Sequence, residues 1–185
     1  ERPGTTHYVV VDKYGNAASV TSTIETGFGS RVMVGGFLLN NELTDFSFFP
    51  DRNGRLIANR VQGGKRPRSS MAPTVVLKEG KPFLITGSPG GSRIISYVAR
   101  TILNVLEWGL DPQAAINSGH IVNRNGVTEL EEETDAINLK EGLESLGHKV
   151  KIRNLNSGLH SILFAQDGTL IGAADPRREG LVMGE

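Results

Sequence analysis

Two adjacent threonines, Thr5 and Thr6, follow a proline and a glycine near the start of the chain. A threonine hydroxyl is a poor nucleophile until a base removes its proton, and a free α-amine on the same residue can be that base. This chemistry requires the bond between Gly4 and Thr5 to be cut, and glycine before the cut tolerates a strained backbone. An ordinary strand that begins with two β-branched residues accounts for the same pattern.

A glycine-rich segment at residues 87–92 (Gly-Ser-Pro-Gly-Gly-Ser) follows an apolar run and precedes a helical pattern. Backbone N–H groups beside a helix N-terminus suit a developing oxyanion or a bound anion. The spacing matches neither a phosphate-binding P-loop nor the dinucleotide-binding fingerprint. A plain strand-to-helix turn is the alternative interpretation.

Two polar segments could bind the charged groups of a substrate. Ser69 and Ser70 stand beside two arginines, and their hydroxyls could donate to a carboxylate. Residues 40–45 combine amides with the carboxylates of Glu42 and Asp45, without the spacing of an EF-hand calcium loop. Solvated loops explain both segments as well.

Composition excludes several other chemistries. The chain of 185 residues contains no cysteine, which excludes disulfides, thiolate zinc sites and cysteine nucleophiles. Its four histidines lack the spacing of a metal motif, so we expect them to be structural or exposed. No Gly-x-Ser-x-Gly elbow is present, although a Ser-His-Asp triad stays open. A net charge of +0 gives no footprint for nucleic acid, and no apolar run approaches the ~18–20 residues that span a bilayer.

Strands are expected in adjacent antiparallel pairs, because runs rich in β-branched and aromatic residues are separated by short turn signals. The expected pairs are 6–12 with 17–24, 74–78 with 82–87, and 159–165 with 169–174. Residues 48–68, which are rich in glycine, proline and asparagine, are predicted to form a long surface loop.

Helices are predicted mainly after the second strand pair, with the longest over 92–108 and a stop at Gly109. Its apolar stripe is predicted from Ile94, Ile95, Val98, Ile102, Val105 and Leu106. Asp111 and Pro112 favour a short helix to about 118, and another helix is expected over 135–146. Antiparallel strand pairs with separately grouped helices predict an α+β fold.

Taken in this order, the motifs resemble the small, catalytic subunit of the γ-glutamyltranspeptidases over essentially the whole chain. The matching segments are Thr5-Thr6-His7-Tyr8, Val11-Asp12, Gly15-Asn16, Phe28-Gly29, Leu38-Leu39-Asn40-Asn41, Asp45-Phe46-Ser47, Lys65-Arg66-Pro67, Ser69–Thr74, Gly87–Arg93 and Asp175-Pro176-Arg177. The resemblance implies the N-terminal-nucleophile αββα sandwich, two stacked antiparallel sheets between helix layers, of which this chain is the C-terminal half. It also implies a precursor that cuts itself before the catalytic threonine and yields two associated subunits.

Catalytic roles follow from the same resemblance. Thr5 is the implied nucleophile, and the amine that cleavage would free on it is the implied base. Thr23 matches the threonine that hydrogen-bonds and positions the nucleophile. Gly90 and Gly91 match the residues whose N–H groups form the oxyanion hole.

Substrate-binding roles are implied for five further residues. Ser69 and Ser70 match the serines that hold the α-carboxylate of the γ-glutamyl group. Glu42 and Asp45 match the residues that hold its α-ammonium. Glu25 occupies a position where well-studied members often have an asparagine that contacts this amino group, so Glu25 is a departure from the family pattern.

The expected function is γ-glutamyl transfer from glutathione and related amides to water, amino acids or peptides through a threonyl ester. Residues 1–4 are expected to be a leader from the large-subunit side, and residues 5–185 the small-subunit part of a single domain. The expected partners are the large subunit, a γ-glutamyl donor and an acceptor, with no nucleic acid. The resemblance implies no metal or organic cofactor, and a periplasmic or secreted location.

Two alternatives stay open. A cephalosporin (glutaryl) acylase-like amidase would use the same nucleophile on an acyl group that lacks the α-ammonium. A maturation-dead homologue with a binding or structural role is favoured only by the leader Glu1–Gly4, which still precedes Thr5 in the sequence.

Overall fold

The computed structural model describes residues 4–184, so the first three residues of the expected leader lie outside the described residues. The chain divides into two compact units. The first contains the residues up to Thr5 together with Ser22–Ser70, and the second contains Thr6–Thr21 together with the chain from Met71 onward.

The second unit is built on a four-stranded antiparallel sheet. Its strands are β7 (Thr74–Lys78), β8 (Lys81–Gly87), β12 (His160–Phe164) and β13 (Leu170–Ala174). The hairpins β7–β8 and β12–β13 confirm two of the predicted pairs. In addition, β12 pairs with β8 and places His160 opposite Gly87, at the point where the glycine-rich segment begins.

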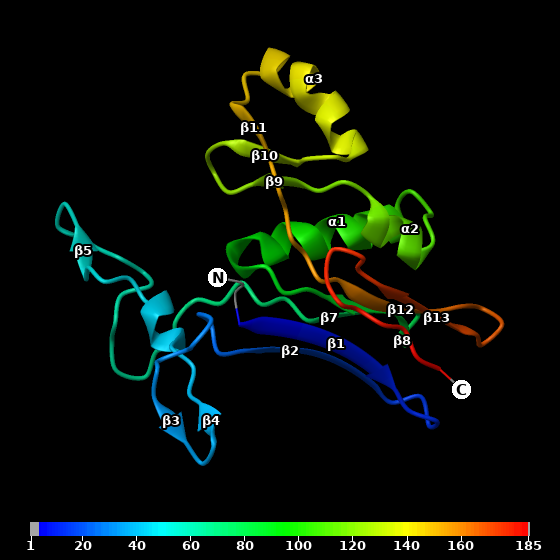
Figure 1. Cartoon of the computed structure of the whole chain (residues 1–185), viewed down its shortest axis with the longest axis horizontal. Coiled ribbons are helices and arrows are strands. Elements are labelled where there is room, and N and C mark those ends of the chain that lie inside the picture. The colour runs from blue at the N-terminus through cyan, green and yellow to red at the C-terminus, as the bar shows by residue number, and fades with distance from the viewer. Residues whose placement is uncertain (1–3, 185) are drawn as a thin grey trace. The chain divides into compact units, whose positions relative to one another are not determined.

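Helices cover one face of this sheet, and a β-hairpin covers the other (Figure 1). The elements are β1 (Thr5–Val11), β2 (Ala17–Thr23), the 3₁₀ turn η2 (Gly91–Arg93), α1 (Ile94–Leu106) and α2 (Pro112–Asn117). β1 pairs with β2 as predicted, and the Ser19 hydroxyl of β2 donates to the Thr86 carbonyl of β8 over 2.9 Å. Asp111 caps α2 as predicted, because its carboxylate accepts from two N–H groups of the first turn. No helix within residues 4–184 is long and apolar enough to cross a bilayer.

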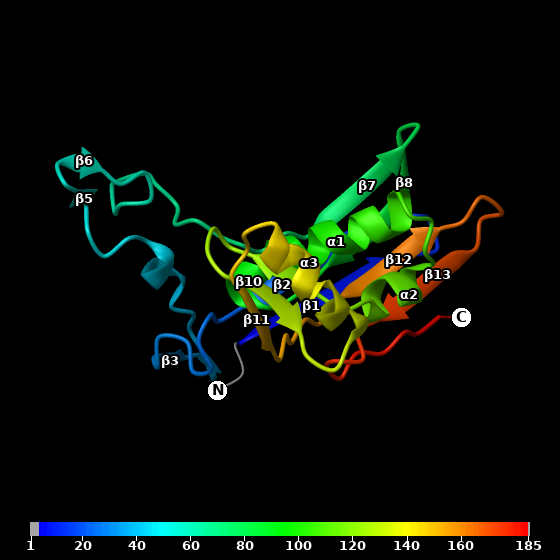
Figure 2. The same ribbon diagram turned by 90° about the horizontal axis from the view of Figure 1, so that it is seen from above.

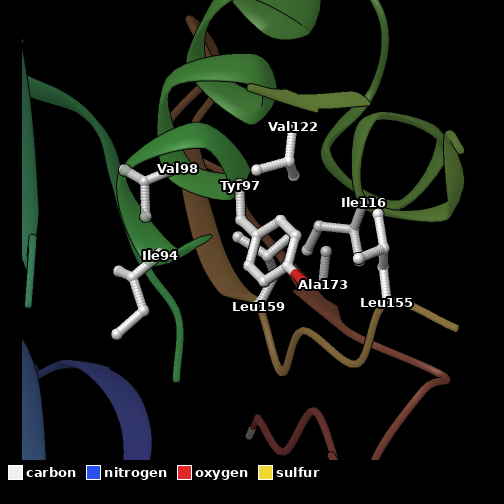
Figure 3. Close-up of a cluster of buried hydrophobic side chains, with 8 residues drawn as sticks. All are labelled: Ile94, Tyr97, Val98, Ile116, Val122, Leu155, Leu159 and Ala173. Carbon is white, nitrogen blue, oxygen red and sulfur yellow. The ribbon is translucent and has the colours of Figure 1, made fainter. Parts of the chain in front are cut away.

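The main core of the second unit lies between α1 and the sheet (Figure 3). There, Ile94, Tyr97 and Val98 of α1 meet Ile116 of α2 and Leu159, and all five are at most 3% exposed. Because burying a side chain of this size contributes roughly 1.5–3 kcal/mol, this cluster is a principal source of the unit's stability.

The predicted stripe on α1 is partly wrong. Ile95 and Leu106 are 57% and 43% exposed, whereas Thr101 and Asn104 are buried. Those two polar side chains donate to main-chain carbonyls at 3.0 and 3.2 Å, so the core satisfies them. The buried face is therefore set by the helical repeat, and a prediction from residue type alone wrongly placed Ile95 and Leu106 on it.

A second sheet in this unit is absent from the sequence prediction. Its strands and connecting helices are β9 (Ile121–Asn123), β10 (Thr128–Glu131), η3 (Asp135–Leu139), α3 (Lys140–Ser145) and β11 (Val150–Arg153). β9 is antiparallel to β10, and β11 is parallel to it. The helix expected over 135–146 is instead η3 followed by α3. These two elements connect β10 to β11 and bring the chain back to the start of β10, as a parallel strand pair requires. The α+β class with mainly antiparallel sheets is confirmed.

The first unit has short elements only, and Figure 2 shows their hairpins from above. They are β3 (Met33–Val34), β4 (Phe37–Leu38), η1 (Glu42–Asp45), β5 (Asp51–Arg52) and β6 (Arg55–Leu56). The predicted loop over 48–68 therefore contains the short hairpin of β5 and β6. Among the described residues of this unit, Phe46 is the only buried hydrophobic side chain. The exposed phenylalanines are Phe28, Phe37, Phe48 and Phe49.

Candidate active site

Thr5 and Thr23, which the family resemblance implies are a nucleophile and its positioning partner, come together in the first unit. Thr5 begins β1 and Thr23 ends β2, and their hydroxyl oxygens lie 2.9 Å apart. Thr23 Oγ1 also accepts a hydrogen bond from the N–H of Glu25 over 2.8 Å. This second contact holds the Thr23 hydroxyl in place, so it can orient Thr5.

Gly4, before the expected cut, has a steric reason to be glycine. Its N–H donates to the Glu25 carbonyl over 3.1 Å, and its carbonyl accepts from Ile24 N–H over 3.0 Å. A Cβ on Gly4 would stand 2.6 Å from Ile24 Cγ1 and 2.9 Å from the Thr26 carbonyl oxygen. Close packing against the adjacent segment, residues 24–26, therefore requires glycine here, in addition to any need for backbone freedom.

Three carboxylates gather in the first unit. Burial, followed by the charges of Asp45 and Glu25, raises the pKa of Glu42 above its usual value of 4.5. Oε1 of Glu42 is buried without a hydrogen-bond partner among the described residues. A carboxyl group whose pKa is raised by neighbouring carboxylates favours a bound cation, and a substrate ammonium supplies both a charge and N–H donors.

Glu25, the departure from the family pattern, is held in an unusual conformation. Its φ of +71° lies in the left-handed region, which side chains other than glycine rarely adopt. Its carboxylate accepts a hydrogen bond from Asn41 Nδ2 over 2.8 Å. Asn41 itself accepts from the N–H and the hydroxyl of Thr26, both over 3.1 Å. The backbone conformation of Glu25 and its hydrogen bond from Asn41 together fix the direction of the Glu25 carboxylate.

Asn59 is a further residue of the site that sequence reasoning missed. Its Nδ2 donates to the Asp45 carbonyl over 2.6 Å, and its Oδ1 accepts from the N–H of Arg68 over 3.0 Å. It therefore ties the acidic turn η1 to the segment that leads into Ser69 and Ser70. Of these two serines, Ser69 is exposed and Ser70 is half-buried. Asn59 lies in the predicted loop, where no local pattern marks it.

Gly90 and Gly91 belong to the second unit, between β8 and α1. Both have positive φ angles, +137° and +59°, which favour glycine. A Cβ on Gly90 would stand 2.7 Å from Cε2 of Tyr97, whereas nothing lies within 4 Å of a Cβ on Gly91. The segment therefore presents backbone at the start of the helical region, which suits it to bind a negatively charged oxygen.

His7 is buried beside this segment in the second unit. Its Nδ1 lies 2.8 Å from the Thr21 hydroxyl, and its ring fills the space where a Cβ on Gly87 would stand. Burial, with a smaller effect of His160, lowers the pKa of His7 to about 4. At neutral pH His7 is an uncharged packing residue, in agreement with the structural role expected for it.

Known proteins resemble the chain over its whole length. Residues 1–185 match the family model described as Gamma-glutamyltranspeptidase. The chain is 44% identical over 184 residues to the glutathione hydrolase proenzyme of Escherichia coli (strain K12), covering 94% of this chain and 31% of that protein. A solved mutant of the Helicobacter pylori γ-glutamyltranspeptidase has a TM-score of 0.82 at 36% identity, covering 94% of this chain and 100% of that one.

An acylase is also among the relatives. The chain is 36% identical over 183 residues to the acylase ACY 1 proenzyme of Pseudomonas sp. (strain SE83), covering 97% of this chain and 32% of that protein. The chain thus spans about a third of the length of the curated relatives it matches. Since glutathione hydrolases and an acylase both match at this level, the substrate has to be argued from the site, while the family itself is established. The chain belongs to the gamma-glutamyltranspeptidase family.

Proposed function

We propose that this chain is the catalytic-subunit part of an enzyme that transfers γ-glutamyl groups from glutathione and related amides to water, amino acids or peptides. In this proposal residues 1–4 are a leader, and residues 5–185 form half of an αββα sandwich completed by the large subunit of the same precursor. The enzyme acts in the periplasm or outside the cell.

The contact between Thr5 and Thr23 carries this proposal. A hydroxyl held at 2.9 Å by a second, anchored hydroxyl is oriented for attack, and it lies at the site expected for self-cleavage. A plain β-hairpin needs no such pair, because its stability comes from main-chain hydrogen bonds and cross-strand packing. The pair therefore favours a catalytic threonine over a structural one.

The first half-reaction forms an ester on Thr5. Cleavage before Thr5 frees its α-amine, which takes the proton of the Thr5 hydroxyl as Oγ1 attacks the γ-carbonyl carbon of the donor. The N–H groups of Gly90 and Gly91 stabilise the tetrahedral oxyanion. The C–N bond then breaks, the amine leaves with the proton that the α-amine returns, and a γ-glutamyl ester remains.

The second half-reaction releases the acyl group. Water or the amine of an amino acid or peptide attacks the ester carbon, and the α-amine of Thr5 accepts the attacking group's proton. The C–O bond breaks as the proton returns to the Thr5 hydroxyl. The products are glutamate or a new γ-glutamyl compound, together with free enzyme.

The carboxylate cluster favours this substrate over the glutaryl group of an acylase. A γ-glutamyl donor brings an α-ammonium that places one positive charge among Glu25, Glu42 and Asp45 and offsets part of their repulsion, while a glutaryl group leaves that repulsion in place. Ser69 and Ser70 are proposed to hold the donor's α-carboxylate through their hydroxyls. The acylase activity is therefore the second candidate.

Mass spectrometry of the full precursor and its Thr5→Ala variant tests the proposed function. The wild type should yield a subunit that starts at Thr5 and should hydrolyse γ-glutamyl p-nitroanilide. Thr5→Ala should stay uncut and inactive, whereas the control Thr6→Ala, at the exposed neighbouring position, should mature and turn over normally. Normal activity in Thr5→Ala, or a wild-type subunit that keeps Glu1, would contradict the proposal.

A further inference from the structure

Tyr97 of α1 lies directly against the backbone of Gly90. The ring carbon Cε2 would stand 2.7 Å from a Cβ on Gly90, so only a glycine can approach the ring this closely. Tyr97 is 1% exposed, and Figure 3 shows its ring enclosed with Ile116, Leu159 and Ala173. The position of this ring therefore limits where the Gly90 peptide can lie.

His120 stacks on the same ring. The centroids of Tyr97 and His120 are 4.2 Å apart, with the ring planes tilted by 37°. His120 is 2% exposed, and its Nε2 lies 2.7 Å from the Ser157 hydroxyl. Tyr97 thus contacts both the Gly90 backbone and an imidazole that is itself hydrogen-bonded.

The hydrogen bonds of Ser157 fix the tautomer of His120. Ser157 Oγ lies 2.5 Å from Asp175 Oδ2, and a carboxylate can only accept, so Ser157 donates there. Ser157 Oγ must then accept from Nε2–H of His120, which leaves Nδ1 unprotonated and without a hydrogen-bond partner among residues 4–184. Burial, followed by the charge of Arg177, lowers the pKa of His120 to about 3, so the imidazole stays neutral at physiological pH.

Asp175, the acceptor for Ser157, is buried and fixed by several hydrogen bonds. It is 1% exposed, and its Oδ2 also accepts from Leu159 N–H over 3.0 Å. Its Oδ1 accepts from the N–H and Nη1 of Arg177 at 3.0 and 3.1 Å. Arg177 in turn donates through Nη2 to Glu131 over 2.8 Å. Both oxygens of Asp175 are thereby satisfied, so Ser157 has a fixed acceptor.

The segment that carries Ser157 also contacts the glycine-rich loop directly. The N–H of Gly158 donates to Ser88 Oγ over 3.2 Å, and Ser88 Oγ donates to the Pro89 carbonyl over 2.6 Å. A Cβ on Gly158 would stand 2.7 Å from Pro89 Cγ. The loop is therefore held at Pro89 by this segment and at Gly90 by Tyr97.

We propose that His120 is a positioning residue that acts through Tyr97 to hold the Gly90 peptide in the orientation its N–H needs, with Ser157 and Asp175 as its anchor. The catalytic part of this inference rests on the proposed function, in which Gly90 and Gly91 stabilise the oxyanion. His120 is assigned no contact with the substrate. Its loss should consequently weaken stabilisation of the transition state and leave substrate binding nearly unchanged.

Hydrogen exchange and kinetics of the matured full-length protein test this proposal together. His120→Ala should raise amide exchange in the peptide 87–93. It should lower kcat about tenfold, a smaller loss than the ~10²–10³ expected when an oxyanion donor is removed completely. KM should stay within about twofold of the wild-type value. His120→Phe keeps an aromatic ring and core volume but removes the Nε2 donor, so both effects should be intermediate. Val105→Ala, in a separate core cluster, is the control and should leave loop exchange and kcat unchanged.

The outcomes separate the two proposals. Unchanged exchange at 87–93 in both His120 variants, or an equal rise in Val105→Ala, would overturn the positioning role whatever the enzyme does. If His120→Ala does not fold, His120→Phe against Val105→Ala decides the same question. A wild type that hydrolyses no γ-glutamyl amide, combined with loop exchange that depends on His120, would reject the proposed function and support the positioning role.

Discussion

The hydroxyl oxygens of Thr5 and Thr23 lie 2.9 Å apart, although the two residues are 18 positions apart in the chain. The contact arises because β1 and β2 pair, so the first residue of one strand meets the last residue of the other. A second hydrogen bond, from Glu25 N–H to Thr23 Oγ1 over 2.8 Å, anchors the partner. The hairpin thus delivers two hydroxyls and a carboxylate-bearing residue to one place.

Thr23→Val should lower kcat about tenfold while the protein still matures. Valine keeps the β-branched shape but removes the hydroxyl, and one hydrogen bond is worth about 0.5–1.5 kcal/mol. Thr23→Ser keeps the hydroxyl and should retain most of the activity. Steady-state kinetics on γ-glutamyl p-nitroanilide compares the three proteins. A fully active Thr23→Val would show that Thr5 needs no positioning partner.

The acidic cluster should make the enzyme prefer γ-glutamyl over glutaryl p-nitroanilide by at least ~10²-fold in kcat/KM. The ammonium forms charge-assisted hydrogen bonds worth about 1.5–3 kcal/mol each, and the glutaryl group forms none. Asp45→Asn should reduce this preference more than Glu25→Gln, because Glu25 already accepts a hydrogen bond from Asn41. Equal or greater activity on the glutaryl compound would establish the acylase alternative instead.

Donor binding should weaken as the pH falls. The pKa of Glu42 is raised above 4.5, and an ammonium binds the ionised carboxylate, so donor binding releases a proton. KM should therefore rise as the pH falls through this raised pKa, by at most about tenfold per unit. Glu42→Gln should have a high KM with a flatter pH profile, and the exposed control Glu79→Gln should resemble the wild type. A wild-type KM that is constant from pH 4 to 8 would exclude this role of Glu42.

Gly90→Ala should damage the enzyme more than Gly91→Ala. A methyl group on Gly90 would meet the Tyr97 ring at 2.7 Å, whereas the corresponding space at Gly91 is open. Gly90→Ala should lower kcat by ~10²–10³, the effect of losing an oxyanion donor. Gly91→Ala should lower the free energy of unfolding by about 1–2 kcal/mol, because alanine tolerates the left-handed backbone poorly. It should lower kcat less than Gly90→Ala does. The reverse order in kcat would mean that contact with Tyr97 does not set the position of this loop.

Local patterns predicted much of this molecule because the relevant contacts are local. The hairpins of β7 with β8 and of β12 with β13 follow from strand runs separated by short turns. Asp111 and Pro112 marked the start of α2 correctly, because a carboxylate cap and a fixed φ act on the first turn itself. The pairing of β1 with β2 was predicted in the same way, whereas the contact between Thr5 and Thr23 was implied by the family resemblance.

Contacts between distant segments were not predictable in this way. The parallel pairing of β10 with β11 joins short strands that carry no periodic signal of their own. His120 is buried with its Nε2 hydrogen-bonded to Ser157, which lies 37 residues further along the chain. Asn59 occupies an irregular loop, where only the fold reveals its two partners. Buried polar residues satisfied by remote partners are invisible to a pattern that classifies residues one at a time.

The stability of the mature protein should fall between pH 6.5 and pH 4, in part because of His7. Its folded pKa is about 4, below the ordinary 6.5, and burial is the main cause. Between these values the unfolded chain binds a proton that the folded protein excludes, so stability is complete above pH 6.5 and is lost as the pH falls. The slope for one such histidine is about 1.4 kcal/mol per pH unit.

Apparent melting temperatures at pH 7 and pH 5, measured at one scan rate, test this titration. His7→Gln can keep the hydrogen bond to Thr21 but cannot titrate, so its melting temperature should fall less over this interval than that of the wild type. His148→Asn, at an exposed position, should follow the wild type. The melting temperature of His7→Gln could instead fall as much as that of the wild type between the two pH values. In that case the fold does not prevent protonation of His7, and its burial against Gly87 has to be reconsidered.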